Sequence, residues 1–189
     1  THSYSTAVGY RAATVCTGQE TAAFGTDAML AATSAARATA LGAYANGTGV
    51  MTGNDNTLVG YSSGLVMTSG ASNTAVGKES LKATTTGIQN TAVGANALDA
   101  NTTGQSNVAM GYGALTSSTT ASYNTALGWN ALDAATTGGT NVAVGANALG
   151  LVTTGEQNVA MGLSAGGGMT TADNNVTIGY AAGKDALTT

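Results

Sequence analysis

The sequence predicts an all-β protein, a parallel β-roll solenoid of about eleven rungs with 17 residues each. Two observations predict it. Glycine returns at a nearly fixed interval along the chain, and each glycine closes a similar phrase, seen in NTAVG at 90–94. A fixed period of this length is typical of solenoids, in which copies of one supersecondary unit stack on one another. The several glycines in each period leave no room for a helix of about ten residues.

The repeating glycines define the rungs. The first three intervals between them are 16, 17 and 18 residues, and every later interval is 17. We expect residues 1–189 to form one continuous solenoid domain, with rungs from about residue 5 to residue 183. Because the chain begins without Met or a signal sequence, we also expect it to be a segment of a longer fibre. The glycines are Gly9, Gly25, Gly42, Gly60, Gly77, Gly94, Gly111, Gly128, Gly145, Gly162 and Gly179.

The phrase before each glycine predicts a short strand. We number each rung from the residue four places before its glycine, called position 0. Position 1 is Thr or Val except at Ala22, position 2 is Ala in nine rungs, and position 3 is always bulky and apolar. Strand side chains alternate, so we expect position 3 to be buried, position 2 to face the other way, and the chain to turn at the glycine.

Asparagine occupies position 0 in eight successive rungs. Stacked Asn side chains can hydrogen-bond to their own copies in neighbouring rungs, as amide ladders do in cross-β stacks. We therefore expect a structural ladder along the rod. Its members are Asn56, Asn73, Asn90, Asn107, Asn124, Asn141, Asn158 and Asn175.

A small residue and often a leucine follow each corner, as in Ala97–Leu98, and predict a second short strand. A return loop with paired threonines, such as Thr85–Thr86, comes next. A glycine usually follows the pair, as at Gly87, Gly104, Gly138 and Gly155, and we expect it to adopt positive φ.

The alanine column at position 2 indicates that the chain does not act alone. A solvated strand face would normally carry polar residues, and this column carries almost none. We expect either the facing strand of the same rung or another copy of the chain to cover it. A single slim roll also has a poor surface-to-volume ratio, so we expect a closed homo-oligomer.

The repeating phrase resembles the head repeats of trimeric autotransporter adhesins, whose signature is close to N-S-V-A-I-G followed by two variable residues and a small one. The matching strings are NTAVG at 73–77 and 90–94, NVAMG at 107–111 and 158–162, NTALG at 124–128, and NVAVG at 141–145. The resemblance covers residues 5 to about 183. It implies a left-handed parallel β-roll, three chains to a head, and adhesion at a cell surface.

The rung departs from that family in its length. It carries an added TTG loop, and the fuller phrase NTAVG-x-x-AL-x-x-x-TTG looks more like repeats of bacteriophage tail fibres. Such fibres share the trimeric β-roll, so the resemblance implies a homotrimer in either case. It leaves the biological role open, because one fold serves different functions.

Composition argues against several functions. The charged fraction is 7% and the net charge −4, which gives no basic surface for nucleic acid, and no apolar run is long enough to insert into a membrane. His2 is the one histidine and Cys16 the one cysteine, so no catalytic triad or transition-metal ligand set can be assembled. We expect no enzyme activity, no cofactor and no metal site. The turns GNDN at 53–56 and ADNN at 172–175 could ligate a hard cation, but turn chemistry accounts for them.

The variable residues after each corner are the candidate recognition surface. If exposed along one side of the rod, they would form a sparse aromatic stripe for a host-surface glycan or protein receptor. The alternative is that they cover turns or line the seam between subunits. The candidates are Tyr10, Arg11, Tyr44, Tyr61, Lys78, Tyr112, Trp129 and Tyr180.

The repeat and its resemblances are consistent with three functions. The first is an extracellular structural fibre, a phage tail fibre segment that contributes to host attachment. The second is a trimeric autotransporter adhesin head on a bacterial cell surface. The third is an ice-binding solenoid, although the adjacent threonines would not share a flat strand face as a strand-borne T-x-T would.

Overall fold

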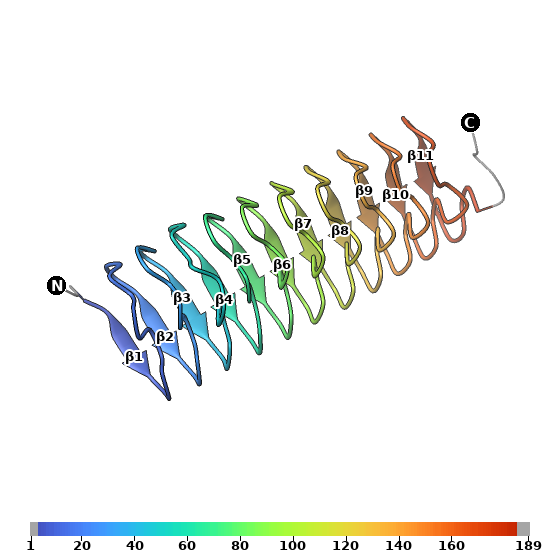
Figure 1. Ribbon diagram of the computed structural model, residues 1–189. Helices are drawn as coiled ribbons and strands as arrows, with labels where there is room; N and C mark the ends of the chain where they lie inside the picture. The colour runs from blue at the N-terminus through green and yellow to red at the C-terminus, as the bar shows by residue number, and fades with distance from the viewer. Residues whose placement is uncertain (1–3, 185–189) are drawn as a thin grey trace.

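The computed structural model describes residues 4–184, which form an elongated β-solenoid (Figure 1). Eleven three-residue strands stack in chain order into one parallel sheet, which confirms the predicted all-β parallel solenoid. The described residues contain no helix, and hence none that could cross a membrane. The strands are β1 (Thr6–Val8), β2 (Ala22–Phe24), β3 (Thr39–Leu41), β4 (Thr57–Val59), β5 (Thr74–Val76), β6 (Thr91–Val93), β7 (Val108–Met110), β8 (Thr125–Leu127), β9 (Val142–Val144), β10 (Val159–Met161) and β11 (Val176–Ile178).

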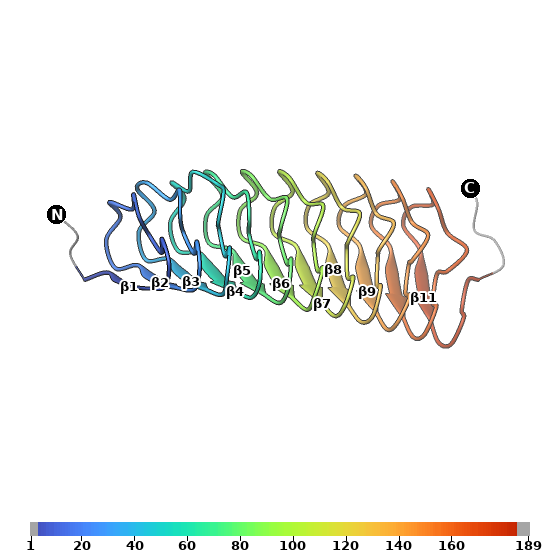
Figure 2. The same ribbon diagram turned by 60° about the horizontal axis from the view of Figure 1, so that its bottom comes forward.

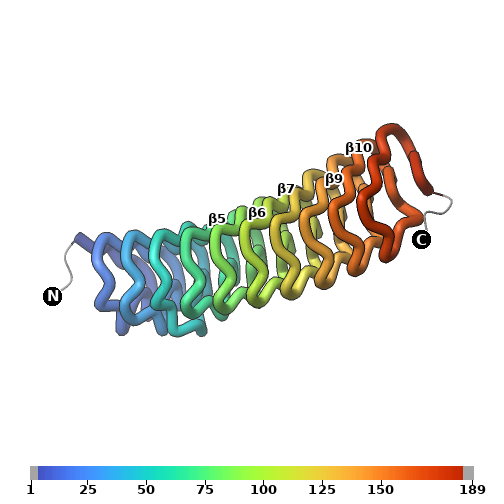
Figure 3. The backbone as a smooth tube through the Cα atoms, turned by 90° about the horizontal axis from the view of Figure 1, so that it is seen from above, coloured from blue at the N-terminus to red at the C-terminus, as the bar shows by residue number. Residues whose placement is uncertain are grey.

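Each strand pairs with the same positions of the next. Ala92 of β6 lies opposite Ala109 of β7, and Ala109 lies opposite Ala126 of β8. The strands form one long side of the rod and the turns form the other (Figure 2), with successive rungs stacked from the N-terminal to the C-terminal end (Figure 3). The register therefore repeats rung by rung, so each position of the repeat forms a column along the rod.

The prediction that position 3 is buried is wrong. The alanines at position 2 of β2, β3 and β5–β10 are fully buried, whereas the bulky residues at position 3 point outward and are exposed or half-exposed. In the five rungs of β5–β9 a fully buried leucine at position 8 fills the narrow interior from the opposite side, and only a small side chain fits between this leucine and the sheet. The alanine column is thus covered by its own rung and not by a second chain.

Two exceptional rungs show this size complementarity directly. Where position 2 carries Leu58 instead of alanine, position 8 carries Gly64, and a Cβ added there would meet Leu58 Cδ2 at 2.9 Å. Where position 2 carries Thr177, position 8 carries Gly183, and an added Cβ would meet Thr177 Cγ2 at 2.8 Å. In these two rungs a larger residue at position 2 is matched by a glycine at position 8.

The predicted second strand is also wrong. Positions 5–11, which we call the turn wall, are a series of turns in which positions 6 and 8 both have positive φ, as in Asn96 (60°) and Leu98 (52°). The wall still joins the rungs. Asn96 N–H donates to Lys78 O of the preceding rung, and Leu98 N–H donates to Ala114 O of the following one, both within 3.0 Å. A strand would need extended residues throughout, so the left-handed residues exclude it.

Five leucines adopt this left-handed conformation at position 8, which is unusual for a non-glycine residue. The conformation costs about 1–2 kcal/mol per residue. Full burial of a leucine side chain contributes about 1.5–3 kcal/mol. Since all five are fully buried, burial offsets the backbone cost. They are Leu81, Leu98, Leu115, Leu132 and Leu149.

The glycine at position 4 is required by the corner itself. Its φ lies between 121° and 145° in every rung, and a Cβ added to Gly94 would meet the carbonyl oxygen of Gly111 at 2.5 Å. The glycines after the paired threonines were predicted to have positive φ, and this is wrong for Gly87, Gly104, Gly138 and Gly155. The positive φ of that corner falls two residues later, as at Gln89 (59°).

The asparagine column forms a buried ladder of hydrogen bonds. Asn107 Nδ2 donates to Asn90 Oδ1 at 3.2 Å and to the backbone carbonyl of Ala121 at 2.8 Å. Its Oδ1 accepts the backbone N–H of Asn124 at 2.9 Å. Side-chain contacts of this kind join Asn56 to Asn175, and all but the last Asn are fully buried. The ladder links the strand of each rung to its neighbours and to the return loop.

The two threonines of each pair have different roles. The first threonine donates its hydroxyl to the next rung, as Thr102 Oγ1 does to Thr119 O at 3.0 Å. The second threonine, such as Thr103, is exposed. The hydroxyls of the first column thus hold the return loops together and are not available to solvent as donors.

Removal of one ladder amide should destabilise the rod. Asn107→Ala deletes three hydrogen bonds in the interior, so we expect the free energy of unfolding to fall by about 3 kcal/mol, at roughly 1 kcal/mol per bond. Chemical denaturation followed by circular dichroism measures the change. Thr103→Ala, on the exposed surface of the neighbouring rung, should change it by less than about 0.5 kcal/mol. Equal effects of the two variants would contradict a stabilising ladder.

The packing of position 2 against position 8 predicts a compensating pair. Ala126→Leu should overpack the interior and lower the free energy of unfolding by about 1–3 kcal/mol. Leu132→Gly alone leaves a cavity and should also destabilise. The double variant reproduces the arrangement of Leu58 and Gly64, so its loss should be clearly smaller than the sum of the two single losses. Additive losses in denaturation experiments would show that the two positions do not share one space.

Candidate functional site

The outward side of the sheet is an uncovered apolar surface. We call it the apolar sheet face, formed by the side chains at positions 1 and 3 of all eleven strands. Position 3 contributes large exposed side chains, including Met110 (41% exposed), Leu127 (45%) and Met161 (48%). Position 1 is mainly threonine in the N-terminal half and valine at Val108, Val142, Val159 and Val176. The face is therefore most apolar towards the C-terminal end.

The predicted aromatic stripe is interrupted but exposed. Tyr112 and Trp129 occupy position 5 of neighbouring rungs, and each is about half exposed, at 54% and 52%. Tyr180 at the same position is 80% exposed. Tyr44 and Tyr61 contact each other edge to face, with ring centroids 5.9 Å apart. The rings thus form separate groups along one corner of the rod.

The charged candidates have intramolecular partners. The Arg11 guanidinium forms a two-point ion pair with Asp27 at 2.7 Å and lies 5.1 Å from the centre of the Tyr10 ring. Lys78 Nζ lies 3.9 Å from Glu79 Oε1. Arg11 and Lys78 therefore have contacts that do not depend on a ligand.

The two acidic turns considered as cation sites use their carboxylates elsewhere. Asp55 of the first turn accepts two hydrogen bonds from Arg37, at 2.6 and 2.9 Å. Asp173 of the second accepts the backbone N–H of Glu156 at 2.7 Å. Within residues 4–184 no group of three or more His, Cys, Asp or Glu residues could hold a metal ion. His2 lies outside the described residues.

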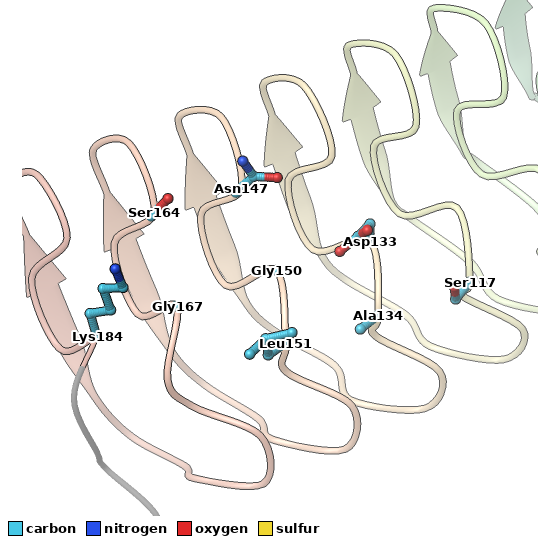
Figure 4. A pocket seen from close by; sticks show the side chains of 9 residues that line it. All are labelled: Ser117, Asp133, Ala134, Asn147, Gly150, Leu151, Ser164, Gly167 and Lys184. Atoms are coloured by element: carbon cyan, nitrogen blue, oxygen red, sulfur yellow. The ribbon is translucent and has the colours of Figure 1, made fainter.

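A hollow lies on the outer side of the turn wall near the C-terminal end (Figure 4). We call it the notch. It has a volume of about 430 Å³ and is lined by residues from the turns after β7–β11. Gly150 and Gly167, both at position 9, leave the space empty. Asp133 and Lys184 occupy position 9 of the rungs on either side of them, and Asn147, Ser164 and Leu151 complete the lining.

The polar groups of the notch are available for binding. No side-chain hydrogen bond between described residues involves the Asn147 amide or the Ser164 hydroxyl, and both residues are only half-buried. Burial raises the pKa of the Asp133 carboxyl above its ordinary value, and backbone N–H groups of Asp133 and Ala134 partly oppose the shift. The carboxylate is thus incompletely solvated where it borders the space.

The notch is not apparent from the repeat pattern alone. None of its lining residues belongs to the predicted aromatic stripe. The signal was the loss of side chains at position 9 in two successive rungs, where earlier rungs carry Lys82, Asp99 and Thr116. This loss of side chains indicates a hollow only if position 9 is known to point outward. The predicted second strand did not give the direction of position 9.

Comparisons of this chain with protein-family models, with curated proteins and with solved structures find no match.

The ion pairs near the N-terminal end predict sensitivity to acid. Hydrogen bonds from Arg11 and Arg37 lower the pKa of the Asp27 and Asp55 carboxyls. Their contribution to stability is present above the unfolded-state pKa of about 3.9 and is lost as the pH falls through the lower folded-state pKa. We expect Asp27→Asn to lower the thermal midpoint at pH 7 and to match the parent protein at strongly acidic pH.

Thermal unfolding between pH 2 and pH 7 measures this difference. Glu156→Gln is the matched control, because Glu156 forms no ion pair within the described residues. A constant difference between Asp27→Asn and the parent protein at every pH would contradict the role of the ion pair.

Proposed function

We propose that the chain is a segment of an elongated surface fibre in which three copies pack together through their apolar sheet faces, each wound as a left-handed roll. The observation that carries the proposal is the outward row of large apolar side chains on β1–β11. A solvated sheet face would normally alternate to polar residues, and position 3 has none. The contact between copies is thus assigned to this face and not to the alanine column, whose members in β2, β3 and β5–β10 are fully covered within the chain.

The apolar sheet face supplies part of the area that assembly needs. Eleven strands at about 4.8 Å spacing extend about 50 Å, and three residues at about 3.3 Å give a width of about 10 Å, so the flat area is about 500 Å² before side-chain relief. The largest apolar patch of a typical monomer is about 300–600 Å² and is often functional. A stable interface buries about 800 Å² per partner. The exposed ring of Tyr112 along the adjoining corner can supply further area.

The number of copies and the winding follow from the resemblance of the repeated phrases to trimeric autotransporter heads and phage tail fibres. The 17-residue rung with its threonine loop favours the tail fibre, so we place the protein in a virion fibre that contributes to host attachment. The strings NTAVG, NVAMG and NVAVG favour the second candidate, the head of a bacterial surface adhesin. The sequences that flank residues 1–189 distinguish the two, since an adhesin continues into a coiled-coil stalk and a membrane anchor.

Ice binding is not proposed. The sheet face lacks threonine at position 3, and valine replaces it at position 1 in four of the five C-terminal strands. The first threonine of the return loop donates its hydroxyl to the next rung. A regular flat array of paired threonines is therefore absent from the described strands.

Charges on the apolar sheet face should separate the copies. In Met110→Glu/Leu127→Glu, association would bury two unpaired carboxylates per chain, and burial of such charges is strongly unfavourable. We expect the parent protein to sediment with the mass of three chains and the double variant as a monomer. Thr103→Glu/Thr120→Glu, on the exposed loop column of neighbouring rungs, is the matched control and should stay trimeric. A parent protein that is monomeric at micromolar concentrations would overturn the proposal.

A further inference from the structure

The emptiness of the notch is not imposed by the backbone. Gly150 and Gly167 do not have positive φ. A Cβ on Gly150 would first meet Asn147 O at 3.2 Å and Asp133 Oδ1 at 3.5 Å, and one on Gly167 would first meet Ser164 O at 3.0 Å, close contacts that shifts of a few tenths of an ångström relieve. Other rungs carry Lys82, Asp99 or Thr116 at the same position. The two glycines thus remove side chains at a place where the fold accepts them.

The groups around this space are those that recognise hydroxyls. The Asp133 carboxylate is an acceptor, Asn147 offers both donor and acceptor, and Ser164 and Lys184 can donate. In Figure 4 the Asn147, Ser164 and Lys184 side chains rise from successive rungs along the same side of the hollow. Successive rungs are about 4.8 Å apart, which is close to the length of one sugar ring, so a chain of rings can lie along the rod.

A residue with an exposed aromatic ring is hydrogen-bonded through its backbone to the lining of the notch. The backbone N–H of Asn147 donates to the carbonyl of Trp129 at 2.9 Å, so the residue that carries the indole is bonded to a lining residue. Trp129 is 52% exposed. An indole offers a flat apolar surface with a polar N–H, which suits a ligand that has one apolar face and many hydroxyls.

We infer that the notch binds a saccharide, with its hydroxyls on Asp133, Asn147 and Ser164. The site lies on the turn wall, opposite the sheet (Figure 2), and therefore stays accessible when the apolar sheet faces are packed together. The inference gives the proposed fibre a class of partner and depends on that proposal only for its biological setting.

The experiment titrates the parent protein with maltotriose, chitotriose and trigalacturonic acid, followed by saturation-transfer NMR and calorimetry. We expect at least one of them to bind. Asn147→Ala and Gly150→Thr should each weaken that binding at least tenfold, the first by removing hydrogen bonds and the second by filling the space. Asn96→Ala changes the same position three rungs away and Asp99→Asn changes position 9 there, and both should bind as the parent protein does.

The variant Lys184→Gln distinguishes an acidic saccharide from a neutral one. If only trigalacturonic acid binds and Lys184→Gln weakens it, the ligand is an acidic saccharide held through its carboxylate. If the neutral sugars bind equally well in Lys184→Gln, it is a neutral one. The inference is overturned if no sugar binds at millimolar concentration, or if the notch variants, with unchanged circular dichroism, bind as tightly as the parent protein. Sedimentation of the same samples reports assembly separately, so failure of one proposal does not hide failure of the other.

Discussion

The buried asparagine ladder determines the register on which the rest of the rod depends. Each ladder amide bonds to its neighbours and to the return loop, so a slip of one residue would leave interior polar groups without partners. From Asn56 onward the period is constant at 17 residues. In the first three rungs, which lack the ladder, the period varies, and surface ion pairs span 16 residues at Arg11–Asp27 and 18 at Arg37–Asp55. Variation in length occurs where the amides are absent.

The narrow interior explains how one side of the rod comes to be apolar. Where leucine at position 8 fills the space from the turn wall, the sheet contributes only alanine inward, and its larger side chains are left outside. The left-handed backbone of the turn wall directs Leu98 and its equivalents inward, while positions 9 and 10 of the same rungs stay partly or fully exposed. The same geometry therefore produces the surface proposed for assembly and the opposite surface that carries the notch.

Much of the fold could be predicted from the sequence because the repeat is strict. The period predicted the parallel stack, the glycine predicted the corner, and the asparagine column predicted the ladder. Alternation alone defines two faces without telling which is interior, and this caused the error at position 3. The decisive signal was the coincidence of Leu58 with Gly64 in one rung. The turn wall could not be predicted because buried leucines rarely adopt positive φ, and the notch could not be found without it.

The constant period also bears on how such a chain can change over generations. The residues that maintain the stack occupy positions 0, 2, 4, 7, 8 and 12, and the outward positions do not contribute to it. Duplication or deletion of one 17-residue unit keeps every column aligned and alters the length of the rod by about 4.8 Å. Unequal recombination within the gene can therefore lengthen the fibre, or move a pair of glycines and their polar neighbours along it, without redesign of the interior.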